Sequence, residues 1–211
     1  AVGAGGFARV SAALDRLANA AGANVLKLHA GDALTGTLYF NRAGADGEAD
    51  AALMNTVCFD AFTLGNHEFD SADAGLVKFI DYLHAGSCQT PVLSANVRPA
   101  AGTPLAARIA DATIVVRSGQ AVGVIGLTVK DKTQFASRPD ATTAFLDETA
   151  AAQAAIDALR ARGVNKIVLL SHLGYDADKA IAPKLSGVDV IVGGDSHTLL
   201  GPDSMQGFGL T

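Results

Sequence analysis

Four short clusters of polar residues that could do chemistry lie along the chain, each directly after an apolar run. They read His29-Ala30-Gly31-Asp32, Gly65-Asn66-His67-Glu68-Phe69-Asp70, Ser171-His172 and Gly193-Gly194-Asp195-Ser196-His197. Carboxylate oxygens, amide oxygens and imidazole nitrogens together suit Zn²⁺, Mn²⁺ and related divalent ions. The clusters therefore supply a candidate set of metal ligands, namely Asp32, Asn66, His172, Asp195 and His197.

Each cluster also has a purely structural interpretation. Gly31-Asp32 alone is typical of a turn with a helix cap, and His172 alone fits a hydrogen-bonded histidine beside a core strand equally well. The cluster that begins at Gly65 differs, because three polar residues straight after a buried strand have no packing rationale. Taken together, the four clusters favour a site over four separate structural features.

The elements that must position these clusters alternate between short apolar runs and helical stretches, which indicates an α/β fold. Parallel strands are expected over residues 25–28, 61–64, 92–94, 167–170 and 188–192, and helices over residues 7–20, 48–57, 72–84, 146–162 and 177–185. Residues 113–117 and 121–127 flank a Ser-Gly-Gln turn and predict an antiparallel hairpin. In open α/β sheets, ligands bind at the carboxyl ends of the strands, so we expect the four clusters to converge there.

Composition excludes several classes of protein. The 211 residues, 49% of them hydrophobic and 18% charged, suit one folded domain and not a disordered chain. The net charge of -5, with no cluster of Lys or Arg, disfavours a nucleic acid polymer or an anionic membrane as partner. The longest strongly apolar stretch, residues 121–129, is far shorter than the ~20 residues of a membrane span.

Two cysteines are too few for a cysteine-based zinc finger. Cys58 and Cys88 each precede an expected strand, and these strands follow one another along the chain. A disulfide at the sheet edge opposite the polar clusters and a buried free thiol both remain open.

The polar clusters, taken in order, resemble the signature of the calcineurin-like dinuclear metallophosphoesterases. Three of the motifs occur in an extended form, namely Gly65-Asn66-His67-Glu68-Phe69-Asp70, Ser171-His172-Leu173-Gly174 and Val190-Ile191-Val192-Gly193-Gly194. These extended motifs resemble the 5'-nucleotidase branch, which includes UDP-sugar hydrolase, 2',3'-cyclic nucleotide phosphodiesterase and ecto-5'-nucleotidase. The resemblance implies an α/β/β/α sandwich with metal ligands at the carboxyl ends of its strands. It also implies a periplasmic or extracellular enzyme of nucleotide catabolism.

The resemblance assigns a role to each site residue. Asp32 would bridge two divalent ions, Zn²⁺, Mn²⁺ or similar, with Asn66, His172 and Asp195 completing one ion's site and His197 serving the other. A metal-bridged hydroxide would then attack the phosphoester of a small-molecule nucleotide. His67 would assist at the phosphate, and Asp70 would orient His67 and stabilise its imidazolium.

Two departures from the family pattern are visible. The family carries an Asp-x-His motif on a first strand, and residues 1–211 are expected to be a catalytic domain without that strand and without the C-terminal nucleotide-binding domain of the branch. Asp195 stands where the family's last motif, Gly-His-x-His, has its first histidine. Because a carboxylate is a harder ligand than imidazole, this change is expected to shift the choice of metal more than to abolish binding.

Alternatives remain at this point. A non-catalytic metallophosphoesterase-like binding module accounts for the missing Asp-x-His, and related hydrolases act on UDP-sugars, NAD, cyclic nucleotides or thiosulfate esters. A dinucleotide binder built on the glycines of residues 3–6 is the weakest option, because no strand precedes them. Outside the main set, His29 and His84 are expected to be structural, and Asn96 is an additional candidate contact to phosphate.

Overall fold

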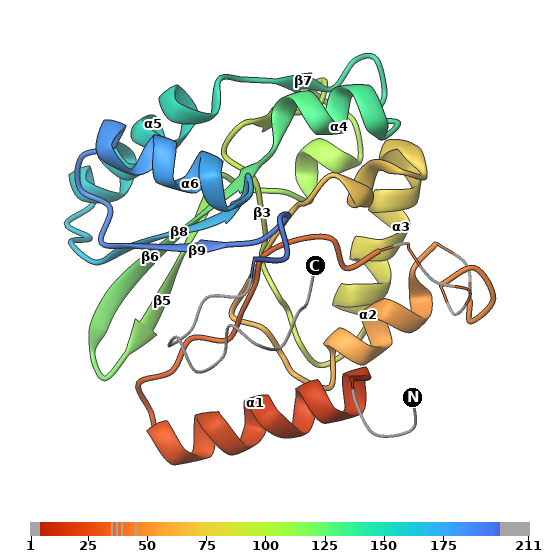
Figure 1. Ribbon diagram of the computed structural model, residues 1–211, viewed down its shortest axis with the longest axis horizontal. Coiled ribbons are helices and arrows are strands. Elements are labelled where there is room, and N and C mark those ends of the chain that lie inside the picture. Colours follow the sequence, from red (N-terminus) through yellow and green to blue (C-terminus); the bar gives the residue numbers. More distant parts are fainter. Residues whose placement is uncertain (1–4, 35, 37, 39, 45, 199–211) are drawn as a thin grey trace.

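The computed structural model describes residues 5–198 except residues 35, 37, 39 and 45, and within them two β-sheets lie face to face between layers of helices (Figure 1). The first sheet is parallel, with the order β1-β2-β3, and consists of β1 (Leu28–His29), β2 (Ala61–Thr63) and β3 (Val92–Leu93). Its apolar outer face packs against α1 (Phe7–Ala21), α2 (Glu48–Met54) and α3 (Ala72–Ala85).

The second sheet has the order β5-β6-β8-β9. β5 (Ala112–Arg117) and β6 (Gln120–Thr128) form the predicted antiparallel hairpin, whereas β8 (Ile167–His172) and β9 (Val190–Gly193) continue from β6 in parallel. α5 (Glu148–Ala161) and α6 (Tyr175–Ile181) pack against the outer face of this second sheet and contribute to the core there. α4 (Lys130–Ala136) follows β6. The predicted α/β/β/α sandwich is confirmed.

The two sheets approach each other very closely at Gly126 of β6. A Cβ atom at this position would lie 2.5 Å from the backbone carbonyl carbon and oxygen of Leu93, so only glycine fits. Polar bonds also cross the gap, because Thr63 Oγ1 accepts a hydrogen bond from the Leu127 amide at 3.0 Å and Thr128 Oγ1 donates one to the Leu64 carbonyl at 2.8 Å. These contacts fix how the strand ends of one sheet lie relative to those of the other.

Several elements differ from the sequence expectation. The strand expected over residues 25–28 is reduced to Leu28–His29, and the helix expected over residues 48–57 ends at Met54, before the left-handed Cys58. The helix expected over residues 177–185 begins at Tyr175 and gives way to a 3-10 turn at Ala182–Lys184, because Pro183 cannot continue an α-helix.

Short elements account for the structure that was not predicted. They are α4, the antiparallel pair β4 (Val97–Arg98) and β7 (Ala144–Phe145), and the 3-10 turns His67–Phe69 and Leu105–Ala107. α4 carries no amphipathic signal, because Thr133 is its buried residue whereas Phe135 is 89% exposed. No helix in the described part of the chain is both long and apolar enough to cross a membrane.

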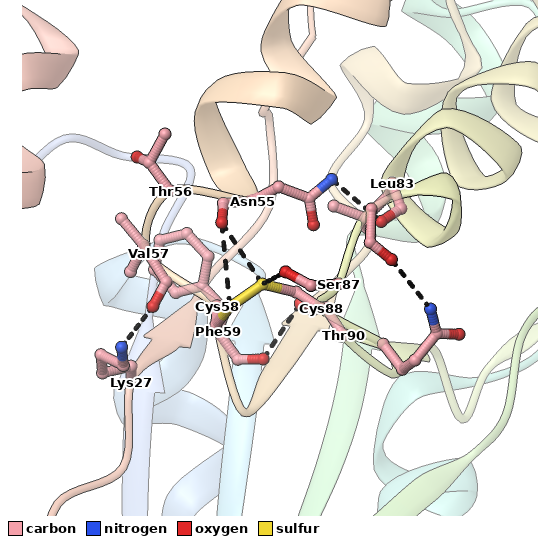
Figure 2. The surroundings of a disulfide bond; sticks show 12 residues. Lys27, Asn55, Thr56, Val57, Cys58, Phe59, Leu83, Ser87, Cys88 and Thr90 are labelled. Atoms are coloured by element: carbon pink, nitrogen blue, oxygen red, sulfur yellow. Dashed lines mark hydrogen bonds between the residues drawn. A yellow bond between two sulfur atoms is a disulfide. The ribbon is translucent and has the colours of Figure 1, made fainter.

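Cys58 and Cys88 form a disulfide (Figure 2), with their Cα atoms 5.2 Å apart. Both precede parallel strands of the first sheet, so the bond lies at the amino ends of these strands, opposite the polar clusters. Of the two possibilities that the sequence left open, the structure contains the disulfide. It ties the end of α2 to the segment after α3, since the two cysteines are 30 positions apart.

We expect the double substitution Cys58→Ser/Cys88→Ala to lower the free energy of unfolding by about 3 kcal/mol, because a loop of this length gains conformational freedom in the unfolded chain. Urea unfolding followed by circular dichroism measures the change. A reducing agent should lower the stability of the wild type to that of the variant and leave the variant unchanged. Equal stability of wild type and variant under oxidising conditions would contradict this expectation.

Candidate metal centre

Three of the predicted ligands converge where the carboxyl edges of the two sheets meet. Asp32 follows β1, His172 ends β8 and Asp195 follows β9, and one ligand atom from each lies within 4.8 Å of the other two. His172 Nε2 is 3.1 Å from Asp32 Oδ2 and 3.6 Å from Asp195 Oδ1. Two carboxylates and one imidazole thus face a common point, as a divalent cation requires.

The orientation of His172 is set from the opposite sheet. Its Nδ1 donates a hydrogen bond to the Ala30 carbonyl at 2.5 Å, which leaves the lone pair of Nε2 directed toward the two carboxylates. Nε2 is buried and has no hydrogen-bond partner among the described residues. Once Nε2 has lost its proton, an imidazole held in this way can bind a metal ion through that nitrogen.

Asn66 gives a second sign that these residues fit a cation. Its side chain is 1% exposed, and its Oδ1 is buried without a hydrogen-bond partner in the part of the chain that the structure describes. An unpaired buried acceptor is costly, so such an atom calls for a partner such as water, a ligand or an ion. Asn66 follows Gly65, which packs against both Asp32 and His172.

Glu68 holds together the two loops that carry Asp32 and Asn66. It is fully buried, and its carboxylate accepts four backbone hydrogen bonds, from the amides of Asp32 at 2.9 Å, Ala33 at 2.7 Å, Leu34 at 3.3 Å and Gly65 at 2.6 Å. In return, the amide of His67 donates to Asp32 Oδ1 at 2.9 Å. Both the backbone of Asp32 and its carboxylate are therefore fixed before any ligand binds.

Glycines allow these groups to approach so closely. A Cβ on Gly65 would lie 2.6 Å from the Asp32 amide nitrogen and 2.8 Å from His172 Cε1. A Cβ on Gly194 would lie 2.5 Å from the Ala30 carbonyl oxygen. The glycines in these two motifs thus make room for the polar side chains beside them.

Burial and mutual charge set the protonation of the group. Burial alone would raise the pKa of Asp32, but its contact with His172 moves that pKa below the ordinary value. Burial would lower the pKa of His172, but Asp32 moves it above the ordinary value. Burial, followed by the charge of Asp32, raises the pKa of Glu68 to about 7, and the backbone amides that it accepts counteract this effect.

His67 and Asp70 form the predicted pair beside the centre. His67 Nδ1 and Asp70 Oδ2 are 2.7 Å apart, and the two side chains are 44% and 29% exposed. Because Nδ1 is used for this contact, Nε2 is the nitrogen available to a ligand. The pair is thus accessible from solvent, unlike Asn66 and His172.

His197 lies outside the close group formed by Asp32, His172 and Asp195. It is exposed and lines a neighbouring cavity of about 470 Å³, together with Tyr175, Lys179 and Ile191. Its predicted role at a second ion stays a prediction.

The remaining candidates of the sequence analysis are accounted for by packing. His29 contacts the rings of Phe59 and Phe62 edge-on, and burial lowers its pKa to about 4, so it is structural as expected. His84 lies in the last turn of α3, and its ring bonds the Thr90 carbonyl at 2.9 Å. The interpretation of Asn96 as a phosphate contact was wrong, because this residue is fully buried and its amide bonds Ser94 and both backbone groups of Thr128.

Sequence reasoning missed two residues at the centre. The motif contains Glu68, but nothing in its spacing indicated that one carboxylate would accept four amides from two loops. Lys132 carried no signal at all, although its ammonium forms an ion pair with Asp195. Both contacts depend on chain segments that are far apart in the sequence.

Comparison with known proteins decides the family. Residues 3–199 match the calcineurin-like phosphoesterase family. The chain belongs to this family, whose members use divalent metal ions. The predicted fold and family are therefore confirmed.

Several of the most similar proteins bear the names 5'-nucleotidase or NAD nucleotidase. The chain is 47% identical over 206 residues to a probable 5'-nucleotidase of Treponema pallidum. This alignment covers 98% of this chain and 33% of that protein. It superimposes on the structure of the Haemophilus influenzae NAD nucleotidase with a TM-score of 0.86 and 45% identity, covering 95% of this chain and 38% of that one. For a 5'-nucleotidase precursor from Thermus thermophilus the TM-score is 0.84, the identity 46%, and the coverage 94% and 37%. The chain thus spans about one third of the length of such curated relatives.

We expect Glu68→Gln to lower the free energy of unfolding by about 2–4 kcal/mol, because the amide group of glutamine would place N–H donors against backbone N–H donors. The variant should also bind Mn²⁺ more weakly, since Asp32 loses its fixed position. Chemical unfolding and titration calorimetry measure the two effects. Glu48→Gln, at an exposed position of α2, is the matched control. Wild-type stability of Glu68→Gln would show that the four hydrogen bonds do not hold the loops.

Proposed function

We propose that this chain carries the catalytic centre of an enzyme that hydrolyses nucleotide phosphoesters with the help of two divalent ions. One observation carries the proposal: Asp32, His172 and Asp195 converge on one point, and Asn66 Oδ1 and His172 Nε2 are buried without a hydrogen-bond partner among the described residues. Buried polar atoms are usually hydrogen-bonded, so these two favour a ligand or an ion as partner. The family and the names of the relatives support the same activity.

Asp32, Asn66, His172 and Asp195 would hold one ion, and His197 would contribute to the second. Ligands of mixed carboxylate, amide and imidazole type suit Zn²⁺ or Mn²⁺. When bound, such ions neutralise the charge that develops on phosphoryl oxygens and favour attack by water. The net charge of -5 is therefore no obstacle to an anionic substrate.

His67 would act at the phosphate. Asp70 holds its Nδ1, so that Nε2 can donate a proton or a hydrogen bond to the phosphoryl or leaving oxygen. The amide of His67 binds Asp32 Oδ1, which couples the position of the ring to that of the carboxylate. Asp70 would keep the imidazole in the donating orientation and would not touch the substrate itself.

A 5'-nucleotide is the proposed substrate class, and AMP and NAD are the two compounds to compare. The relatives bear the names 5'-nucleotidase and NAD 5'-nucleotidase, which are statements about those proteins. We also propose a periplasmic or extracellular location. The Cys58–Cys88 disulfide supports it, because such bonds persist in oxidising compartments.

The complete natural protein should release phosphate from AMP, or cleave NAD, only with Mn²⁺, Zn²⁺ or Co²⁺ present, and a chelator should abolish the activity. Asp32→Asn should reduce kcat at least ~100-fold, because the uncharged amide weakens metal binding. Asp15→Asn, an exposed change on α1, should leave the rates unchanged. Equal activity of wild type and Asp32→Asn would overturn the proposal.

The role of His67 is tested separately. His67→Ala should lower kcat about 100-fold or more, whereas Asp70→Asn should lower it about 10-fold, because the ring remains but loses its orientation. Neither variant should change the affinity for Mn²⁺, which titration calorimetry measures. A loss of metal binding in His67→Ala, with rates restored at high Mn²⁺, would assign the residue to the metal site instead.

A further inference from the structure

Lys132 lies against the candidate metal centre. It belongs to α4, and its Nζ forms an ion pair with Asp195 Oδ1. The same oxygen is 3.6 Å from His172 Nε2. The ammonium therefore binds the carboxylate oxygen that faces the other residues of the centre, and Oδ2 instead lies beside Gly174.

The fold brings Lys132 to this position. β6 pairs in parallel with β8, with Thr128 opposite His172, so α4 begins at the carboxyl edge that carries the centre. The Lys130 amide ties the start of the helix to α5 by donating to Glu148 Oε1 at 2.9 Å, and within the helix Thr133 Oγ1 donates to the Val129 carbonyl. The Lys132 side chain, 43% exposed, reaches from the solvent side to a carboxylate that is only 15% exposed.

Charge explains why this contact matters. The described part of the centre contains two carboxylates, Asp32 and Asp195, beside a single imidazole. Asp32 and Asp195 both approach the His172 ring, and Lys132 compensates part of their charge. A divalent ion at Asp195 Oδ1 would compete with the ammonium for the same oxygen, because the two cations repel each other at such a distance.

We propose that Lys132 is an internal counter-ion of the metal centre. It binds Asp195 Oδ1 in the metal-free protein and is displaced when a divalent ion takes that oxygen. Lys132 thereby stabilises the metal-free fold and weakens metal binding, which makes it a determinant of metal affinity. The inference rests on the proposed function in one respect, the role of Asp195 as a ligand.

The test compares Lys132→Met, Lys132→Arg and Lys130→Met in the complete protein. Titration calorimetry with Mn²⁺ gives the dissociation constants, and thermal unfolding in a chelator gives the stability of the metal-free state. Lys132→Met should bind the ion at Asp195 about 10-fold more tightly than wild type, because one competing charge is gone. It should also unfold at a lower temperature without metal. Lys132→Arg, which keeps the charge, and Lys130→Met, on the same helix, should resemble wild type in both measurements.

The opposite signs of the two effects make the test decisive. A residue with a merely structural role would lose stability and metal affinity together, and that result would overturn the proposal. Unchanged Mn²⁺ affinity with a raised KM for the nucleotide would overturn it as well and would make Lys132 a substrate contact. Mn²⁺ affinity and the stability of the metal-free protein are measured without nucleotide hydrolysis, so a wild type that binds Mn²⁺ but hydrolyses no nucleotide refutes the proposed function alone.

Discussion

The buried carboxylate of Glu68 is the interaction on which the rest of the centre depends. Four backbone amides from two loops converge on its two oxygens, three of them from the segment after β1. Together with the bond from the His67 amide to Asp32 Oδ1, they join the segment after β1 to the segment after β2. Asp32 adopts a left-handed backbone conformation, with φ of 55°, which is unfavourable for a non-glycine residue without such support. The cost of that conformation and of burying Glu68 is offset by hydrogen bonds to a charged acceptor, which are stronger than neutral ones.

The second requirement is the close contact between the two sheets. Asp32 and Asn66 come from the first sheet, whereas His172 and Asp195 come from the second, so the centre forms only if the sheets are in register. The bond between His172 Nδ1 and the Ala30 carbonyl crosses this junction directly. Gly126 permits the same approach deeper in the sandwich. The packing of the two sheets therefore also fixes the geometry of the site.

Much of this arrangement was predictable from the sequence, for an identifiable reason. The strands that end in Asp32, Asn66, His172 and Asp195 are short apolar runs followed at once by polar residues, and parallel strands bring such ends to one edge. Elements without a periodic signal were missed, as in α4, where a threonine is buried and a phenylalanine exposed. The contact of Lys132 with Asp195 spans 63 positions and follows no local pattern, so only the folded structure reveals it.

The central claim is that Asn66 Oδ1 and His172 Nε2, which have no hydrogen-bond partner among the described residues, bind a divalent ion. Anomalous diffraction from crystals of the complete protein grown with Mn²⁺ tests it most directly. The account predicts an anomalous peak about 2.0–2.3 Å from both atoms and from carboxylate oxygens of Asp32 and Asp195. No peak at this position, with Asn66 Oδ1 hydrogen-bonded to another protein group, would contradict it.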